Sequence, residues 1–264
     1  MTLIDTHCHL YDEAFDSDRS EAVQRALDAG VGTMLLPDID HSSTPRLDAL
    51  AQSHPQHFRR MTGLHPTSVK EDYQAELSHV YSRLQHCREG QDSLPPIVAI
   101  GEIGMDLYWD RTYEKEQTDA LRQQLEWAIE FHLPVALHIR KAHNEVFHLL
   151  RDMGKPAGMQ GVMHCFGGSV QEARKAVEMG FMLGIGGVVT FKNAGLADVV
   201  RDIPLDHLLL ETDAPYLAPT PYRGKRNESS YLPIIAQKIA EIKGTTAAEV
   251  AAQTTANARI LFRL

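Results

Sequence analysis

The sequence has few cysteines and no long apolar segment. Its three cysteines, Cys8, Cys87 and Cys165, include no CxxC pair, which excludes a disulfide framework and a four-cysteine zinc site. No run approaches the ~18 apolar residues of a transmembrane helix. The first residues, MTLIDTHCHL, lack the basic and apolar regions of a signal peptide. We therefore expect a cytoplasmic protein in a reducing compartment, without a membrane partner.

An excess of basic residues is also missing. The 26 Lys and Arg are outnumbered by 35 Asp and Glu, which gives a formal net charge of -9. Tight, indiscriminate binding to duplex DNA depends on many Lys and Arg contacts to phosphates. The composition argues against such binding, but it leaves room for a small basic pocket that holds one or two phosphates.

Short apolar runs alternate with amphipathic helical runs along the chain. The runs predicted to be strands are Leu3–Cys8, Gly32–Leu36, Arg59–Leu64, Ile97–Glu102, Pro134–His138, Gly161–His164, Phe181–Ile185 and His207–Leu210. The predicted helices are Asp18–Ala29, Thr44–Ser53, Ala75–Cys87, Glu114–Phe131, Asn144–Met153, Val170–Met179, Leu232–Lys243 and Ala247–Phe262. This pattern predicts an α/β fold, a (β/α)8 TIM barrel, with a doubly wound open sheet as the alternative. No linker divides residues 1–264, so we expect a single domain.

Candidate metal ligands follow the predicted strands. In a (β/α)8 barrel the chemistry lies at the carboxyl ends of the strands. Six residues of ligand type end or closely follow five of these strands, namely His7, His9, Glu102, His138, His164 and Asp213. Taken singly, each could be a core histidine, a surface carboxylate or an aspartate that opens a turn. Their joint placement predicts a metal site.

The alternation of side chains along a strand adds detail to this site. His7 and His9 are predicted to face the same way, and Cys8 the opposite way. By the same alternation, Asp5 is predicted to point inward one layer deeper, and Glu211 to lie below the last ligand. Buried carboxylates in such positions often orient ligand histidines.

Six ligands are more than one ion needs. They fit two divalent ions bridged by a carboxylate, for which Glu102 is the natural candidate. Mixed histidine and carboxylate ligation suits Zn, Mn or Co, and more weakly Mg, and the sequence does not choose among them.

The ordered motifs resemble those of the TatD family of metal-dependent deoxyribonucleases, within the amidohydrolase-like superfamily. The matching motifs are IDTHCH at Ile4–His9, GLHP at Gly63–Pro66, GEIGMD at Gly101–Asp106, HIR at His138–Arg140, HCFGG at His164–Gly168, ETDAPYL at Glu211–Leu217 and RGKRN at Arg223–Asn227. The sequence departs from the family pattern at positions that are not metal ligands, namely Thr67, Gly168, Ala214 and Ser229.

The resemblance implies a role for each site residue. It places His7, His9 and Asp213 around one metal ion and His138 and His164 around the other, bridged by Glu102, with Asp213 as the general base. It also implies phosphate or leaving-group contacts for three cations, Arg140, Arg223 and Lys225. His65 and Asn227 would shape the substrate pocket.

The function predicted from these observations is metal-dependent cleavage of phosphodiester bonds in DNA, in single strands or at strand ends. We expect DNA as substrate, a monomeric enzyme and no obligate protein partner. One alternative is an amidohydrolase-type enzyme that cleaves an amide, lactone or ester with the same metals and does not need the basic loop at Arg223–Arg226. Another is a non-catalytic binding module on an enzyme fold. No aromatic platform for stacking bases is identifiable in the sequence.

Overall fold

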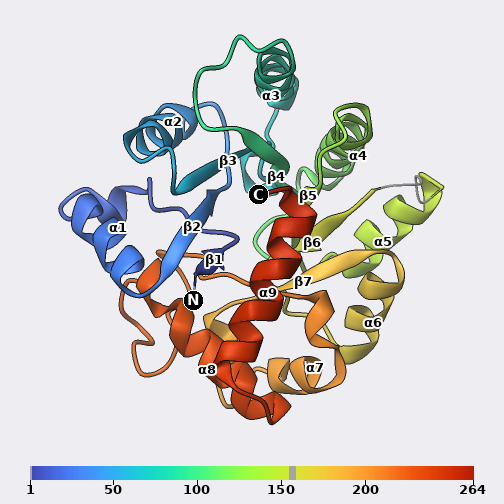
Figure 1. Ribbon diagram of the computed structural model, residues 1–264. Helices are drawn as coiled ribbons and strands as arrows, with labels where there is room; N and C mark the ends of the chain where they lie inside the picture. Colours follow the sequence, from blue (N-terminus) through green and yellow to red (C-terminus); the bar gives the residue numbers. More distant parts are fainter. Residues whose placement is uncertain (1, 155–158) are drawn as a thin grey trace.

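The computed structural model describes residues 2–154 and 159–264, which contain one parallel sheet of eight strands in the order β1 to β8. The strands are β1 (Leu3–Asp5), β2 (Val31–Leu36), β3 (Phe58–Thr62), β4 (Ile97–Asp106), β5 (Val135–Arg140), β6 (Gly161–Met163), β7 (Phe181–Ile185) and β8 (Leu208–Leu210). The amide of Thr6 donates to the carbonyl of Leu210 at 3.0 Å and joins the two ends of the sheet. The predicted (β/α)8 barrel is confirmed (Figure 1).

Helices surround this barrel, and the last of them, α9, crosses one end of it (Figure 1). They are α1 (Arg19–Asp28), α2 (Thr44–Ser53), α3 (Tyr73–Arg88), α4 (Glu114–Glu130), α5 (His143–Asp152), α6 (Val170–Glu178), α7 (Leu196–Asp202), α8 (Leu232–Lys243) and α9 (Ala247–Phe262). The sequence pattern did not predict α7, which has 7 residues and is too short for a clear helical period. Among the described helices, none is both long and apolar enough to cross a membrane.

Both faces of the strands are buried. Inside the barrel, residues such as Ile4, Leu35 and Leu209 pack together, and Leu261 and Phe262 of α9 pack against this inner cluster. A second, larger core lies between the sheet and the helices around it. Burial on both faces explains why the strands read as continuous apolar runs rather than as alternating patterns.

Two strands extend beyond their predicted ends. β4 continues past Glu102 to Asp106, and β5 continues past His138 to Arg140. Gly104 pairs with His138, and a Cβ at Gly104 would lie 1.9 Å from the carbonyl oxygen of His138. The glycine therefore permits the close strand contact that carries Glu102 and His138 to the same end of the barrel.

Candidate metal centre

The carboxylate of Glu102 lies at the centre of a histidine cluster at the carboxyl end of the barrel. Its Oε2 is 3.0 Å from His7 Nε2 and 3.6 Å from His9 Nε2. Its Oε1 is 2.8 Å from His138 Nδ1 and 3.4 Å from His65 Nε2. The two oxygens of one carboxylate thus face two groups of imidazoles, which is the arrangement expected of a bridging ligand.

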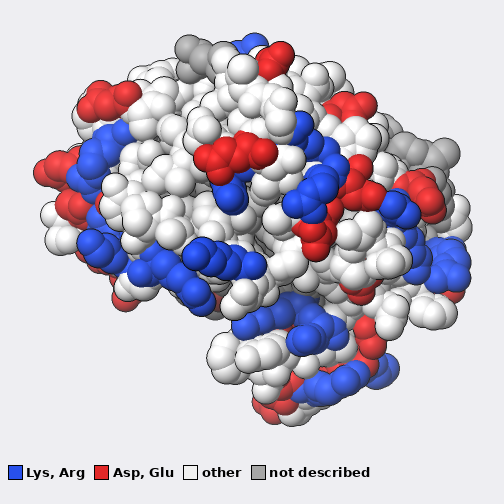
Figure 2. Space-filling view, turned by 90° about the horizontal axis from the view of Figure 1, so that it is seen from below, with Lys and Arg blue, Asp and Glu red and all other residues white. Residues whose placement is uncertain are grey.

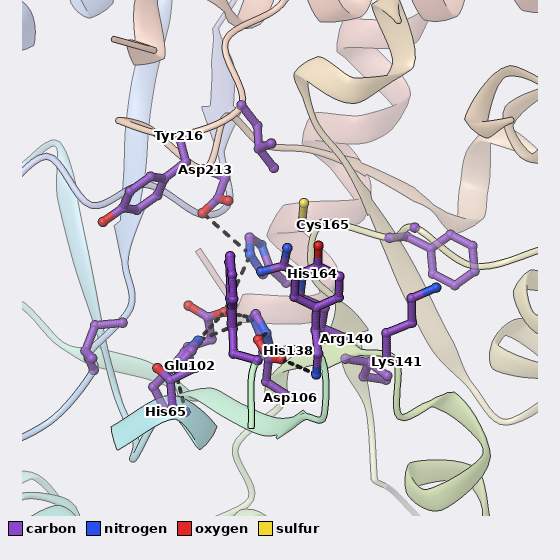
Figure 3. A pocket seen from close by; sticks show the side chains of 18 of the residues that line it. His65, Glu102, Asp106, His138, Arg140, Lys141, His164, Cys165, Asp213 and Tyr216 are labelled. Carbon is purple, nitrogen blue, oxygen red and sulfur yellow. Dashed lines mark hydrogen bonds and ion pairs between the residues drawn. The ribbon is translucent and has the colours of Figure 1, made fainter. Parts of the chain in front are cut away.

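Asp213 and His164 complete the cluster. Asp213 Oδ1 lies 3.5 Å from His9 Nε2 and 3.6 Å from His164 Nε2. The His164 ring stacks on the His7 ring, with centroids 3.4 Å apart. The structure therefore brings together all six residues proposed as ligands. Figure 3 shows Asp213 on one side of His164, with Glu102 and His138 on the other.

The groups of potential ligands overlap at Glu102. One contains His7, His9 and Glu102, a second contains His65, Glu102 and His138, and the donor atoms in each lie within 4.8 Å of one another. His65, which the resemblance placed in the substrate pocket, is therefore also close enough to serve as a ligand. His65 Nδ1 lies 2.7 Å from the Thr67 hydroxyl, which leaves Nε2 facing Glu102.

His164 lies with His7 and Asp213 in a further group of potential ligands. Its ring centroid is 6.5 Å from that of His138, whereas the His65 and His138 centroids are 4.5 Å apart. In this arrangement the nearer imidazole neighbour of His138 is His65, and not the His164 with which the resemblance grouped it.

The chemistry of the donor set fits divalent metal ions. His7 is buried, and its Nδ1 has no hydrogen-bond partner within residues 2–154 and 159–264. Burial, together with the nearby His164, lowers the pKa of His7 to about 4, so the ring is neutral, as a metal ligand must be. Burial opposes the charge of Glu102, yet the surrounding histidines hold its pKa well below the usual range. A neutral His7 beside an ionised Glu102 suits Zn, Mn or Co. Despite burial, the nearby carboxylates raise the pKa values of His138 and His164 to about 9 and about 10, so both rings would release a proton when a metal binds.

Glu211, which was predicted to lie below Asp213, contacts the ring of His164 instead. Its Oε1 is 3.0 Å from His164 Nδ1. Burial alone would lower the pKa of His164, but Glu211, Glu102 and Asp213 outweigh it and raise the pKa to about 10. A Cβ at Gly184 in β7 would lie 2.1 Å from Glu211 Oε2, so this glycine makes room for the carboxylate.

Asp106 is a site residue to which the sequence analysis assigned no role. Its Oδ2 lies 3.0 Å from His138 Nε2, while His138 Nδ1 faces Glu102. A carboxylate behind a ligand histidine fixes the ring orientation and strengthens metal binding. The signal was present, because Asp106 follows Glu102 by four positions, on the same face of a strand.

The alternation argument was right for three residues and wrong for Asp5. His7 and His9 both face Glu102, and Cys8 points to the Leu35 carbonyl. Asp5 follows Ile4, which points into the barrel, and β1 ends at Asp5, so the alternation does not continue to the histidines.

The Asp5 carboxylate instead binds Thr212 and Ser229 in the segments that follow β8. It accepts hydrogen bonds from the Thr212 hydroxyl at 2.6 Å, the Thr212 amide at 3.0 Å and the Ser229 hydroxyl at 2.7 Å. Asp5 therefore secures the segment that carries Asp213 rather than orienting a ligand ring.

The cluster opens into a large cavity. Its volume is about 1240 Å³, and its lining includes Glu102, His138 and Asp213. Sites for small molecules are usually ~300–1,000 Å³, so this cavity has room for a larger or extended substrate. Arg140 and Lys141 also line it, and Figure 3 shows them beside His138.

Comparison with known proteins identifies the family. A family model described as TatD related DNase matches residues 4–263. The chain belongs to the TatD family. It is a metal-dependent hydrolase that acts on ester bonds, and its His, Glu and Asp clusters are able to bind metal.

Relatives match this TatD-family chain over nearly its full length. It is 38% identical over 263 residues to the uncharacterized metal-dependent hydrolase YabD of Bacillus subtilis, covering 99% of both chains. It is 35% identical to the 3′-5′ ssDNA/RNA exonuclease TatD of Erwinia tasmaniensis, covering 99% of this chain and 100% of that one. The crystal structure of YjjV, a TatD homologue from Escherichia coli, matches with a TM-score of 0.89 at 32% identity, covering 99% of this chain and 98% of the other.

Two of the cations proposed as substrate contacts lie outside the described lining of the cavity in this TatD barrel. Arg223 and Lys225 are exposed, and neither is among the described residues that line the cavity. The Arg223 guanidinium lies 4.5 Å from the centroid of the Phe191 ring. Of the three proposed phosphate contacts, the structure brings Arg140 alone into the described cavity lining.

Asn227 also lies outside the described lining of the cavity and is fully buried. Its Nδ2 donates to the carbonyls of Thr212 and Tyr216, each at 2.7 Å. These bonds span the turn that contains Asp213. Asn227 is therefore placed to support the ligand-bearing loop, and the structure does not place it where a substrate in the cavity would contact it.

Proposed function

We propose that this TatD-family protein is a two-metal phosphodiesterase that removes nucleotides from single-stranded DNA. The observation that carries the proposal is the position of Glu102, whose two carboxylate oxygens face two groups of histidines. Two divalent ions bound there, Zn, Mn, Co or Mg, would supply Lewis-acid activation of a water molecule and of the phosphoryl group. The residues that would hold them are His7, His9, Glu102, His138, His164 and Asp213, with His65 within reach.

Asp213 is proposed as the general base. Burial opposes ionisation of its carboxyl group, but His164 and His9 outweigh it and lower the pKa, so the group is a carboxylate at neutral pH. Its side chain is 14% exposed and lines the cavity, so it can reach a water molecule beside a bound phosphate. In the proposed reaction the oxygen of the attacking water bonds to phosphorus while Asp213 accepts the proton that the water loses. The bond from phosphorus to the leaving oxygen breaks, and that oxygen takes up a proton from solvent.

The three cations proposed to contact phosphates differ in whether they line the cavity. Arg140 lines the cavity and is proposed to contact the phosphate that is cleaved or the one next to it. Arg223 and Lys225 lie beyond the cavity and can contact only more distant phosphates of a longer strand. Asn227 is proposed to act on the substrate indirectly, by holding the turn around Asp213.

A single-stranded substrate is supported by the net charge and by a relative. The net charge of -9 argues against a broad duplex footprint. Figure 2 shows both acidic and basic side chains on one side of the molecule. The Erwinia relative bears the name 3′-5′ ssDNA/RNA exonuclease. We extend that polarity to this chain and propose attack from the 3′ end.

One observation favours the small-molecule alternative. Arg223 and Lys225, the cations that a nuclease needs more than a lactonase does, are not among the described residues of the cavity lining. An amidohydrolase-type enzyme for a lactone or ester would use the same ligands. Arg140 and Lys141 within the cavity favour an anionic substrate over a neutral one.

A substrate panel separates the two functions. Purified protein supplied with Mn, Co, Zn or Mg is tested on a 5′-labelled single-stranded oligonucleotide, on the same sequence as a blunt duplex, and on neutral esters and lactones. We expect the single strand to be shortened from its 3′ end, which gives a ladder of 5′-labelled products. The matched variant E102Q is expected to give no such ladder. Turnover of esters or lactones without any oligonucleotide cleavage would contradict the nuclease function and support the amidohydrolase-type function.

A further inference from the structure

Two large aromatic side chains stand exposed at the metal cavity. Tyr108 and Trp109 lie in the segment between β4 and α4, and both line the cavity that contains Glu102. Trp109 is 73% exposed and Tyr108 is 50% exposed. Tryptophan is highly buried on average, and exposed apolar groups beside a cavity often mark a binding surface.

The two rings are held in place rather than free. They meet edge to face with centroids 4.8 Å apart. The guanidinium carbon of Arg140, at the end of β5, lies 4.0 Å from the Tyr108 centroid and 5.2 Å from the Trp109 centroid. A planar cation against aromatic rings forms a preorganised surface on which a further flat π-system can stack.

This surface is directly connected to the metal centre. The Tyr108 amide donates to Asp106 Oδ1 at 3.0 Å, and Asp106 Oδ2 lies 3.0 Å from His138 Nε2. Arg140 follows His138 by two residues on the same strand. A group resting on Trp109 would therefore lie within the same cavity as the proposed metal ligands, close to a phosphate bound there.

We propose that Trp109, Tyr108 and Arg140 form a platform on which a nucleobase of the substrate stacks while the neighbouring phosphate occupies the metal centre. This inference rests on the proposed function and specifies its substrate as a strand with unpaired bases. Base stacking on aromatic side chains tolerates any sequence, because every base has a π-face. A base inside a duplex is already stacked and would have to be extruded at a cost in free energy, so the platform gives a physical reason for a single-strand preference.

The test combines removal of the aromatic ring with removal of the base. Single-stranded oligonucleotides carry an abasic tetrahydrofuran residue at one of the last three 3′ positions, and kcat/KM for each is compared with that of the intact strand. In the unmodified protein we expect one position at which loss of the base lowers kcat/KM by about fivefold to a hundredfold. In W109A we expect the intact strand to lose activity by a similar factor, and the difference between intact and abasic strands to disappear.

Two variants control for folding. W109F keeps a ring and is expected to recover most of the discrimination between intact and abasic strands. I260A removes an equally exposed apolar side chain (Ile260 is 71% exposed) from α9, outside the described cavity lining, and is expected to leave both rates unchanged. If W109A lost kcat/KM equally on intact and abasic strands, Trp109 would only support the segment that follows Asp106, and the platform would be overturned.

The failure of this inference and of the proposed function can be told apart. If the unmodified protein cleaves no oligonucleotide with any metal, the nuclease function fails and the platform has no substrate. If the unmodified protein cleaves the intact strand, but an abasic residue changes its kcat/KM no more than that of W109A, the nuclease function stands and the platform is refuted.

Discussion

Asp106 and His138 form a pair behind the metal centre, with Asp106 Oδ2 3.0 Å from His138 Nε2 on the opposite side of the ring from Glu102. Asp106 is buried at the end of β4, and its other oxygen accepts the Tyr108 amide. The pair resembles the carboxylate–histidine–metal arrangements in which the outer carboxylate tunes the ligand.

The variant D106N tests this role, because the amide keeps the shape of the side chain and removes its charge. We expect a metal affinity lower by about 10- to 100-fold, measured as the metal concentration that gives half-maximal hydrolysis, with recovery of activity at high metal. The matched control is D110N, which alters an exposed carboxylate of the same loop. A D106N protein with unchanged metal dependence would contradict the role.

Asn227 is predicted to contribute to stability more than to substrate binding. Its side chain is fully buried and satisfies the carbonyls of Thr212 and Tyr216. N227A leaves both carbonyls without this donor, and each unpaired buried group costs about 1–3 kcal/mol. We expect a clear fall in Tm by calorimetry, whereas N193A, at an exposed asparagine, should leave Tm unchanged. A raised KM with an unaltered Tm would instead support the substrate contact implied by the family resemblance.

The basic loop is predicted to contain one structural and one peripheral arginine. Arg226 Nη1 lies 2.6 Å from Asp18 Oδ1, and Arg226 Nη2 lies 2.9 Å from Glu228 Oε1. The guanidinium lies over the Phe15 ring. Arg223 is exposed outside the described lining of the cavity.

We expect R226M to lower the free energy of unfolding by about 1 kcal/mol, as measured by urea denaturation, since its ion pairs are partly exposed. R223M should leave that energy unchanged and weaken oligonucleotide cleavage mainly at low salt, because exposed charges are screened at high ionic strength. Equal losses of stability in the two variants would contradict this division.

Much of the fold, and the clustering of the six proposed ligands, was predictable from the sequence, because both depend on short-range patterns. The apolar runs marked the strands, and the polar residues after them marked the end of the barrel where Glu102 and Asp213 both face His9 and His164. The error at Asp5 arose because alternation holds only within a strand, and β1 ends there.

Other features depended on distances between segments that no local pattern encodes. The loop cations looked functional because they follow Asp213 closely in sequence, yet Arg223 extends toward Phe191. The platform of Tyr108, Trp109 and Arg140 escaped notice because exposure of a tryptophan cannot be read from its neighbours in the chain.

The central claim is that Glu102 joins two metal sites, and counting bound ions tests it most directly. The protein and its E102Q variant are stripped with a chelator, reloaded with Zn or Mn, freed of excess metal and measured by elemental analysis, with folding checked by circular dichroism. We predict about two ions per chain in the unmodified protein, and a lower content in a folded E102Q. A single ion in the unmodified protein, or an unchanged content in E102Q, would contradict the bridging role.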